Sequence, residues 1–262
     1  MAKFTLVDDK TDITIAKMHV EGKKRLHLAG VGDDRKSLQV LSTKPNVVTA
    51  TIIALFSGPK GIWTVDLKAK TKGSSEIQAK LAKKIVAKLT INVEEKILLP
   101  AATTEEGLLV RLFLSESRTP SESGYSATDA KTGMQWMRVV LENRLKNKPK
   151  QFNAPGAKKI LDIVKAEGQF HGFEKYPTLS AAQESRINEI VSIANNDSDT
   201  RQEKFAAFLS NALDVANTKS AIKDPCQTGL YGWRTAGRGS PGPRFKIFKT
   251  PMSGNQFYTL KK

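Results

Sequence analysis

The first hundred residues alternate apolar and polar positions in short stretches. A period of two is typical of strands that are buried on one face. The pattern predicts strands at residues 4–7, 13–16, 26–28, 38–41, 47–55, 62–67 and 89–93. Residues that favour turns separate these stretches, at 30–34, 44–46, 57–61 and 72–75. We therefore expect an all-β sandwich of about seven or eight strands.

Pro100 marks a change to a helical period. Thr103 or Thr104 can cap a helix whose first turn carries Glu105 and Glu106, which the helix dipole favours. Apolar residues then recur at helical spacing within 108–113, 134–141, 160–164, 187–194 and 205–213. Beyond about residue 224, glycine, proline and aromatic residues dominate, and short strands are predicted around 247–248 and 257–258. We expect a multidomain chain, with a β-sandwich at 1–99 and a mainly α (α+β) domain at 100–262.

The composition is that of a globular protein rather than a disordered one. The chain has 262 residues, of which 39% are hydrophobic and 26% are charged. Its longest apolar stretches, such as 47–56, are shorter than the roughly 20 residues that span a bilayer. The start MAKFTLVDDKTD lacks the apolar region of a signal peptide, so we expect no ordinary export. The single Cys226 excludes an intramolecular disulfide and a thiolate cluster.

The charge indicates a polyanionic partner. There are 42 basic and 26 acidic residues, which give a net charge of +16 and a pI near 9.8. The excess lies at the two ends: residues 1–100 carry 18 bases and 10 acids, 101–223 carry 17 and 15, and 224–262 carry 7 and 1. Nucleic acid, anionic lipid and peptidoglycan all attract such a chain, and charge alone does not choose among them.

Glu116 lies at the end of the apolar segment LLVRLFLSESRTPSE, just before a proline that ends the helix. A carboxyl group at the end of an apolar face can be desolvated, which raises its pKa and keeps a proton available for donation to a leaving oxygen. Cleavage of a glycosidic bond requires such a proton. The alternative is that Glu116 is an exposed acid that pairs with Arg118 or caps a neighbouring turn.

Four short motifs carry a family resemblance. They are the apolar helix ending in Glu116-Ser117-Arg118, a second helix ending in Asn143-Arg144, the segment ILDIVKAEGQF and the terminal GNQFYTL. In order and spacing across residues 108–262 they resemble the spore-cortex-type, SleB-like cell wall hydrolases. The segment from 47 to 93 more weakly resembles bacterial Ig-like domains.

The first resemblance implies a lysozyme-like domain that cleaves the glycan strand of peptidoglycan, by hydrolysis or by lytic transglycosylation. It implies that Glu116 is the catalytic acid. The chain departs from the family in three places: the interval between Glu116 and Asn143 is longer, the second acid after the turn is out of register, and the closing histidine is Gln256. Glu122 is the candidate for the second carboxylate, and Asp129 and Glu142 remain open.

A glycan groove needs flat apolar surfaces and amide groups around the acid. The predicted substrate-binding residues are Gln169, Phe170, Tyr231, Trp233, Asn255 and Tyr258. The alternative places Phe170 and Phe257 in the core and makes Trp233 the anchor of a loop. A glycine-rich loop with Arg234, Arg238 and Arg244 is expected to cover the groove.

No motif predicts a cofactor or a metal site: the histidines are scattered, and the glycine spacings do not match a phosphate-binding loop. We expect peptidoglycan as the partner and no nucleic acid. The enzyme would be made in the cytoplasm and act in the periplasm or at the cell wall. A secretion machine such as type VI would deliver it as an antibacterial effector, or phage lysis would release it.

The sandwich would then dock on a carrier or on the wall, and a periplasmic immunity protein would block the groove. The alternative function is a non-enzymatic basic protein that binds nucleic acid or an anionic cell-surface polymer. Salt-dependent DNA binding without lytic activity would favour that alternative.

Overall fold

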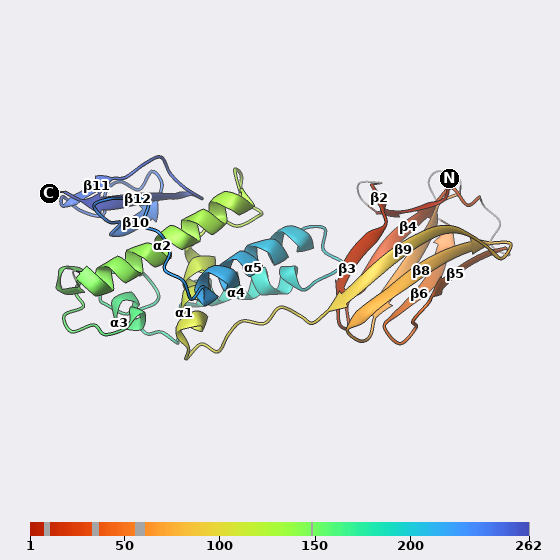
Figure 1. The fold of residues 1–262 in the computed structure, drawn as a ribbon, viewed down its shortest axis with the longest axis horizontal. Helices are drawn as coiled ribbons and strands as arrows, with labels where there is room; N and C mark the ends of the chain where they lie inside the picture. Colours follow the sequence, from red (N-terminus) through yellow and green to blue (C-terminus); the bar gives the residue numbers. More distant parts are fainter. Residues whose placement is uncertain (8–10, 33–36, 56–60, 148, 262) are drawn as a thin grey trace. The chain divides into compact units, whose positions relative to one another are not determined.

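The computed structural model describes residues 1–7, 11–32, 37–55, 61–147 and 149–261. The chain forms two compact units. Unit 1 comprises Met1–Ile97 together with Asn195–Gln202, and unit 2 comprises Leu98–Ala194 together with Glu203–Lys262. The chain is mixed, with β-sheets in both units and, among the described residues, α-helices from residue 105 onward (Figure 1).

Unit 1 contains two sheets. The first is antiparallel, in the order β2-β1-β4-β7-β6, with the bounds Asp12–Ile13, Lys3–Leu6, Lys23–Ala29, Trp63–Ala69 and Val48–Leu55. The second has the order β3-β9-β8-β5, with the bounds Ile15–His19, Lys84–Glu94, Gly73–Leu81 and Leu38–Ser42. In this second sheet β3 pairs in parallel with β9. The expected β-sandwich therefore has nine strands among the described residues.

The core of unit 1 follows from the alternation in its sequence. In β7 the residues Trp63, Val65 and Leu67 are buried, while those between them are more exposed. They join residues of the second sheet, such as Ile77 and Leu89, in one apolar cluster. The two sheets thus pack on the faces that the period of two marks as buried.

One predicted turn was wrong. Residues 73–75 belong to β8, which begins at Gly73, rather than to a turn. Ser75 is buried, and its hydroxyl group lies 2.8 Å from that of Ser42 on the neighbouring strand. A polar side chain that finds such a partner can occupy an inward position of a strand. The predicted turns at 30–34 and 57–61 lie partly outside the described residues.

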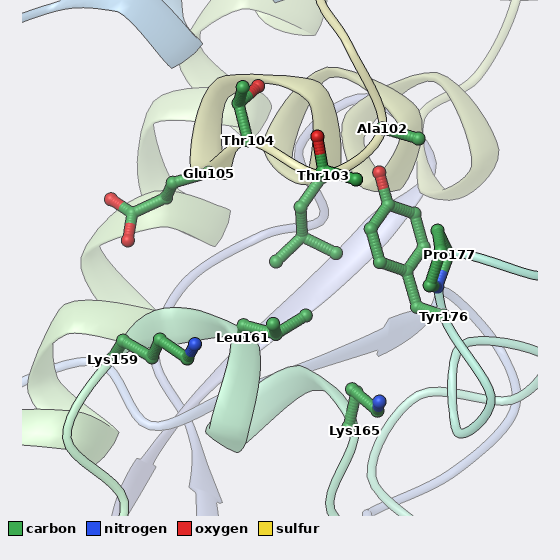
Figure 2. A pocket seen from close by; sticks show the side chains of 10 residues that line it. Ala102, Thr103, Thr104, Glu105, Lys159, Leu161, Lys165, Tyr176 and Pro177 are labelled. Carbon is green, nitrogen blue, oxygen red and sulfur yellow. The ribbon is translucent and has the colours of Figure 1, made fainter.

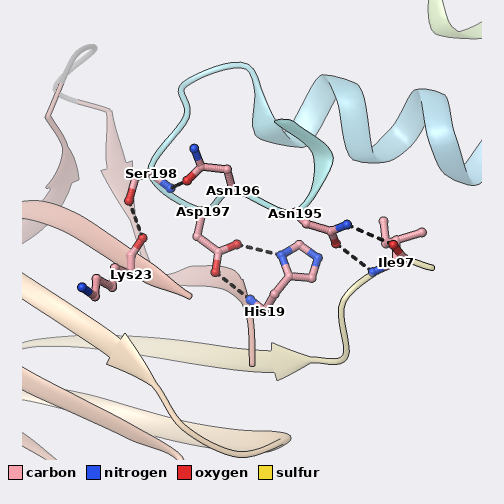
Figure 3. Close-up of polar contacts among 7 residues, drawn as sticks. All are labelled: His19, Lys23, Ile97, Asn195, Asn196, Asp197 and Ser198. Carbon is pink, nitrogen blue, oxygen red and sulfur yellow. Dashed lines mark hydrogen bonds and ion pairs between the residues drawn. The ribbon is translucent and has the colours of Figure 1, made fainter. Parts of the chain in front are cut away.

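A segment from the second half of the sequence completes unit 1 (Figure 3). The carboxylate of Asp197 accepts hydrogen bonds from the backbone N–H and the ring Nδ1 of His19, at 2.7 and 2.8 Å. Asn195 both donates to and accepts from the backbone of Ile97, and Ser198 donates to the carbonyl oxygen of Lys23. The predicted boundary at 99/100 lies near the observed division at 97/98. The prediction did not include residues 195–202 in the first unit.

The helices of the described residues lie in unit 2, except that α5 begins at Gln202, the last residue of unit 1. Their bounds are α1 Glu105–Glu116, α2 Ala127–Asn147, η1 Pro149–Phe152, α3 Ile160–Val164, α4 Ala181–Ala194 and α5 Gln202–Asn217. A small antiparallel sheet follows, in the order β10-β12-β11, with the bounds Gly232–Thr235, Asn255–Leu260 and Phe245–Ile247. The helical period after Pro100 is confirmed. No helix among the described residues is both long and apolar enough to cross a membrane.

Helix α1 carries the acid singled out by the sequence. It begins after Thr104, whose hydroxyl group accepts a hydrogen bond from the N–H of Gly107, so Thr104 rather than Thr103 is the cap. Gly107 lies against the preceding loop, because a Cβ there would come within 2.0 Å of the carbonyl oxygen of Ala101. The helix ends where Ser117 turns to an extended conformation, which leaves Glu116 as its last residue.

Candidate active site

The carboxyl group of Glu116 is held on one side. Its Oε2 accepts a hydrogen bond from the indole Nε1 of Trp233 in β10, at 3.1 Å. Its Oε1 accepts none from the described residues. Among the described residues, the side-chain atoms that are fully buried and lack a hydrogen bond belong to Ser115, Ser117, Tyr125 and Tyr176. Oε1 of Glu116 also lacks a hydrogen bond but is not one of these atoms, so it is not fully buried and keeps some contact with solvent. One oxygen is therefore fixed and the other is available.

The surroundings of Glu116 favour its protonated form. Burial raises the pKa of this carboxyl group above its ordinary value, because the charged form loses its hydration. The hydrogen bond from Trp233 and the positive charges of Arg186 and His171 lower the pKa by less than burial raises it. The proton therefore stays on Glu116 to a higher pH than on a solvated glutamate.

The backbone around Glu116 is held from two directions. The side-chain amide of Asn255, buried at the start of β12, donates to the carbonyl oxygen of Glu116 at 2.7 Å. Arg186 of α4 donates to the carbonyl oxygens of Leu114 and Ser117. These bonds satisfy carbonyl groups that the end of α1 leaves without a partner in the helix. A cation there also interacts favourably with the helix dipole.

The four motif segments meet in unit 2. The ring of Trp233, bonded to Glu116, lies against that of Phe170 with centroids 4.9 Å apart. The guanidinium carbon of Arg144 lies 5.3 Å from the centre of the Phe170 ring, and the same group donates to the side chain of Gln169 at 3.0 Å. Together with Asn255, these contacts connect segments far apart in the sequence to the end of α1.

Arg144 is the most buried cation of this cluster. It donates to the carbonyl oxygen of Tyr231 at 2.8 Å and lies 4.3 Å from the centre of the Phe152 ring. Burial lowers the pKa of Arg144 to about 9, which leaves the guanidinium charged at neutral pH. Its contacts with backbone, amide and rings make it a structural link between α2 and the small sheet.

Two of the predicted binding residues lie in an apolar cluster. Tyr231 stacks on Phe152, and Tyr258 packs edge-on against Phe245. The hydroxyl group of Tyr258 donates to the carbonyl oxygen of Gly239 at 2.8 Å. Both tyrosines are almost fully buried, so their rings face the interior of unit 2.

Glu122 is exposed and already bonded. Its Oε1 accepts hydrogen bonds from the N–H and the hydroxyl group of Thr119 and from Arg186. Burial raises the pKa of Glu122, but these hydrogen bonds and the charge of Arg186 lower it by more, so the pKa lies below its ordinary value. Of the other open acids, Asp129 lies in the first turn of α2 and Glu142 pairs with Arg138.

The sequence analysis did not single out Arg186, and it counted His171 only among the scattered histidines that predict no metal site. Arg186 donates hydrogen bonds to backbone carbonyl groups some 70 positions away in the sequence. A contact over such a separation cannot be predicted from the spacing of residues in the sequence. The alternative partner of Glu116, Arg118, instead donates to the carbonyl oxygen of Gly124. In the predicted loop, Arg234 donates to Ser240, and Arg244 lies over Phe152 and Phe245.

No protein-family model matches this chain, and no curated protein matches it. Among solved structures it is similar to domains 4 and 5 of the S-layer protein SbsC, with 22% identity and a TM-score of 0.25 over 31% of this chain and 48% of that one. It is also similar to the filamin domain of Lin-41, with 13% identity and a TM-score of 0.27 over 36% of this chain and 91% of that one. TM-scores this low carry no conclusion about function.

Proposed function

We propose that the protein is an enzyme that cleaves the glycan strand of peptidoglycan, with Glu116 as its general acid and base. The observation that carries the proposal is the state of one carboxyl group. Glu116 has a raised pKa, one oxygen fixed by Trp233 and the other in contact with solvent. A general acid needs this combination of a retained proton and an accessible oxygen.

In the proposed reaction, Glu116 donates its proton to the bridging oxygen between two wall sugars. The bond from the anomeric carbon to that oxygen breaks, and its electron pair leaves with the oxygen. The Glu116 carboxylate then accepts a proton from the attacking hydroxyl group. That group is the muramyl C6 hydroxyl in lytic transglycosylation, which leaves an anhydro end, or water in hydrolysis.

A single carboxyl group can serve both steps in lytic transglycosylation. The role of Glu122 as a second catalytic carboxylate remains a prediction. Its Oε1 already accepts hydrogen bonds from Thr119 and Arg186. We expect Glu122→Gln to lower activity far less than Glu116→Gln. Asn255, which bonds to the backbone of Glu116, is proposed as a positioning residue.

The experiment is zymography on purified peptidoglycan. We expect the wild type to clear the substrate and Glu116→Gln to lose at least about 100-fold of the rate, since the variant keeps the shape of the side chain but has no proton to give. Glu189→Gln is the matched control, because Glu189 is an exposed acid of α4 without an ion pair among the described residues. Its rate should equal that of the wild type.

Mass spectrometry of the released fragments distinguishes the two chemistries, because only transglycosylation leaves anhydro ends. Equal clearing by the wild type and Glu116→Gln would contradict the proposal. An intact substrate with all variants, together with salt-dependent DNA binding, would favour the alternative of a basic binding protein.

A further inference from the structure

Two arginines of unit 2 lie over the same aromatic ring. The guanidinium carbon of Arg144 lies 4.3 Å from the centre of the Phe152 ring, and that of Arg244 lies 5.1 Å from it. Burial and then the charge of Arg244 lower the pKa of Arg144. Neither guanidinium group forms an ion pair with a described carboxylate. Two neighbouring cations therefore have no counter-ion among the described residues.

Arg144 is fixed inside the protein and still has one unused donor. Its side chain belongs to a residue that is 6% exposed, with Nε bonded to the carbonyl oxygen of Tyr231 and Nη1 bonded to the side chain of Gln169. Nη2 donates to no described residue. It is not one of the fully buried side-chain atoms that lack a hydrogen bond, so it keeps some contact with solvent. A buried cation that lacks both a counter-ion and one hydrogen bond favours an anion at that nitrogen.

This nitrogen lies near the candidate active site. A Cβ at Gly232, the first residue of β10, would come within 3.6 Å of Nη2 of Arg144. The next residue, Trp233, donates to Glu116. The ring of Phe170 contacts both Trp233 and Arg144. Two residues, Trp233 and Phe170, thus connect the unused donor to the carboxyl group of Glu116.

The pocket of about 260 Å³ at the start of α1 is a different kind of place (Figure 2). The charged residues that line it, Glu105, Lys159 and Lys165, are all exposed. Their charges stay hydrated without a ligand. Arg144 has lost most of its hydration, so it gains more from an anionic partner.

We propose that Arg144 and Arg244 form a subsite for a carboxylate of the peptide that is attached to the wall sugar. One carboxylate oxygen would accept a hydrogen bond from Nη2 of Arg144, and Arg244 would supply a second positive charge. This inference rests on the proposed function, since it takes peptidoglycan as the substrate. It extends recognition from the glycan strand to the peptide.

The surroundings of the donor favour a peptide carboxylate over a phosphate group. Phosphate sites gather several donors, often backbone N–H groups at the start of a helix. Here a single guanidinium nitrogen is available on Arg144, and the rings of Phe152 and Phe170 lie against the same group. Apolar walls around one charged donor suit the aliphatic part of a peptide and its carboxylate.

The test is a titration of the full chain with muramyl dipeptide, a wall fragment that ends in a free carboxylate. The fragment has no bond between two wall sugars, so its binding does not require cleavage. We expect saturable backbone amide NMR shifts around residues 169–170 and 231–233. The methyl ester, which lacks the charge, should bind about tenfold more weakly, as expected for loss of a charge-assisted hydrogen bond. Inorganic phosphate tests whether any anion suffices.

Arg244→Gln is the main variant, because Arg244 is exposed and its described side-chain hydrogen bond is to the carbonyl oxygen of Gln151. We expect it to weaken binding of the fragment about fivefold while the rest of the spectrum is unchanged. Arg144→Lys keeps the charge but lacks Nη2 and should weaken binding at least as much. Arg238→Gln is the matched control, since Arg238 is an exposed arginine of the same loop and forms no ion pair among the described residues.

In the cleavage assay, Arg244→Gln should raise the substrate concentration for half-maximal rate and leave the maximal rate unchanged, whereas Glu116→Gln lowers the maximal rate. Absence of saturable shifts, equal binding of the ester or of phosphate, or wild-type binding by Arg244→Gln would overturn the subsite. Failure of the proposed function is distinguishable: the fragment would bind in a manner that depends on Arg244, but the wild type would not clear the wall.

Discussion

At the scale of single residues, Glu116 combines two opposing influences. Burial favours its neutral form, while Trp233, Arg186 and His171 favour the charged one. The balance leaves a raised pKa. A group in this state costs stability when it ionises, so the residue proposed for catalysis also makes the folded state pH-dependent.

Glu116→Gln should therefore stabilise the protein at neutral pH. Below the ordinary glutamate pKa, both the folded and unfolded forms carry the proton, and the variant should match the wild type. As the pH rises through the raised pKa, the wild type loses stability and the variant does not. We expect the variant to be more stable than the wild type at pH 8 and equally stable at pH 4.

Urea unfolding at pH 4 and pH 8 measures this difference. Other groups titrate equally in both proteins and cancel. A constant difference at both pH values would contradict the raised pKa.

Trp233→Phe should shift the pH dependence of the proposed reaction. The change removes the N–H that donates to Glu116 and keeps a ring against Phe170. Because that hydrogen bond lowers the pKa of Glu116, its loss should raise the pKa further. The rate should then fall at a higher pH than in the wild type, and the maximum rate should drop about tenfold because the carboxyl group is less well held.

The measurement is the rate of peptidoglycan cleavage from pH 4 to pH 9. Trp136→Phe is the control, because that indole packs against Phe248 and Phe257 instead. A pH profile that Trp233→Phe leaves in place, or moves to lower pH, would show that the indole does not tune Glu116.

Glu116 was predicted from its place at the end of an apolar segment, and Trp233, Phe170 and Asn255, now found near it, were predicted as the lining of a groove. Their contacts could not be predicted in this way. The bond between Trp233 and Glu116 joins positions 117 apart, and its existence depends on how β10 lies relative to α1. The burial of Tyr231 and Tyr258 likewise depends on Phe152 and Phe245, which the pattern did not connect with them.

At the scale of elements, α1 is defined by its two ends. Thr104 satisfies a free N–H group at the start, and Arg186 binds carbonyl groups at the end. Between them the buried face fixes the rotation of the helix, so that both the pocket and Glu116 depend on the register of one helix.

Thr104→Ala should lower the free energy of unfolding by about 1 kcal/mol, since the N–H of Gly107 loses its partner. Thr103→Ala should change it by less than about 0.5 kcal/mol, because the exposed Thr103 side chain caps nothing. Thermal unfolding of both variants without ligand makes the comparison. Equal losses would mean that the cap is not the hydrogen bond described here.

Helices were the elements best predicted from sequence, because their apolar spacing extends over several turns in α2, α4 and α5. Strand β8 was missed, because no strand was predicted between residues 67 and 89 and its first residues, Gly73, Ser74 and Ser75, favour turns. What overrides this preference is pairing with β9 along the whole strand. Such pairing is tertiary information that no local pattern contains.

At the scale of the whole molecule, the two units are not two successive parts of the chain. Unit 1 needs Asn195–Gln202, which the sequence places after most of unit 2. The bond from His19 to Asp197 spans 178 positions. Composition and periodicity change near residue 100 and therefore predict a division there, but neither reports that a later loop returns to the first unit.

Asp197→Ala should consequently weaken unit 1, although the residue lies in the loop between α4 and α5. The Asp197 carboxylate is fully buried, and its loss leaves the N–H and the ring of His19 without these acceptors. We expect the free energy of unfolding to fall by about 2 to 4 kcal/mol, as for other buried polar groups that lose their partners. Asp197→Asn keeps one acceptor oxygen and should lose less.

Asp214→Ala removes the same charge from an exposed pair with Lys131, where a loss below about 1 kcal/mol is expected. Urea unfolding ranks the three variants, and limited proteolysis reports whether residues 195–202 become accessible. If Asp197→Ala were as stable as Asp214→Ala and as resistant to protease as the wild type, the loop would be a passive neighbour of unit 1. The expected order instead makes the later half of the chain a requirement for the stability of the first.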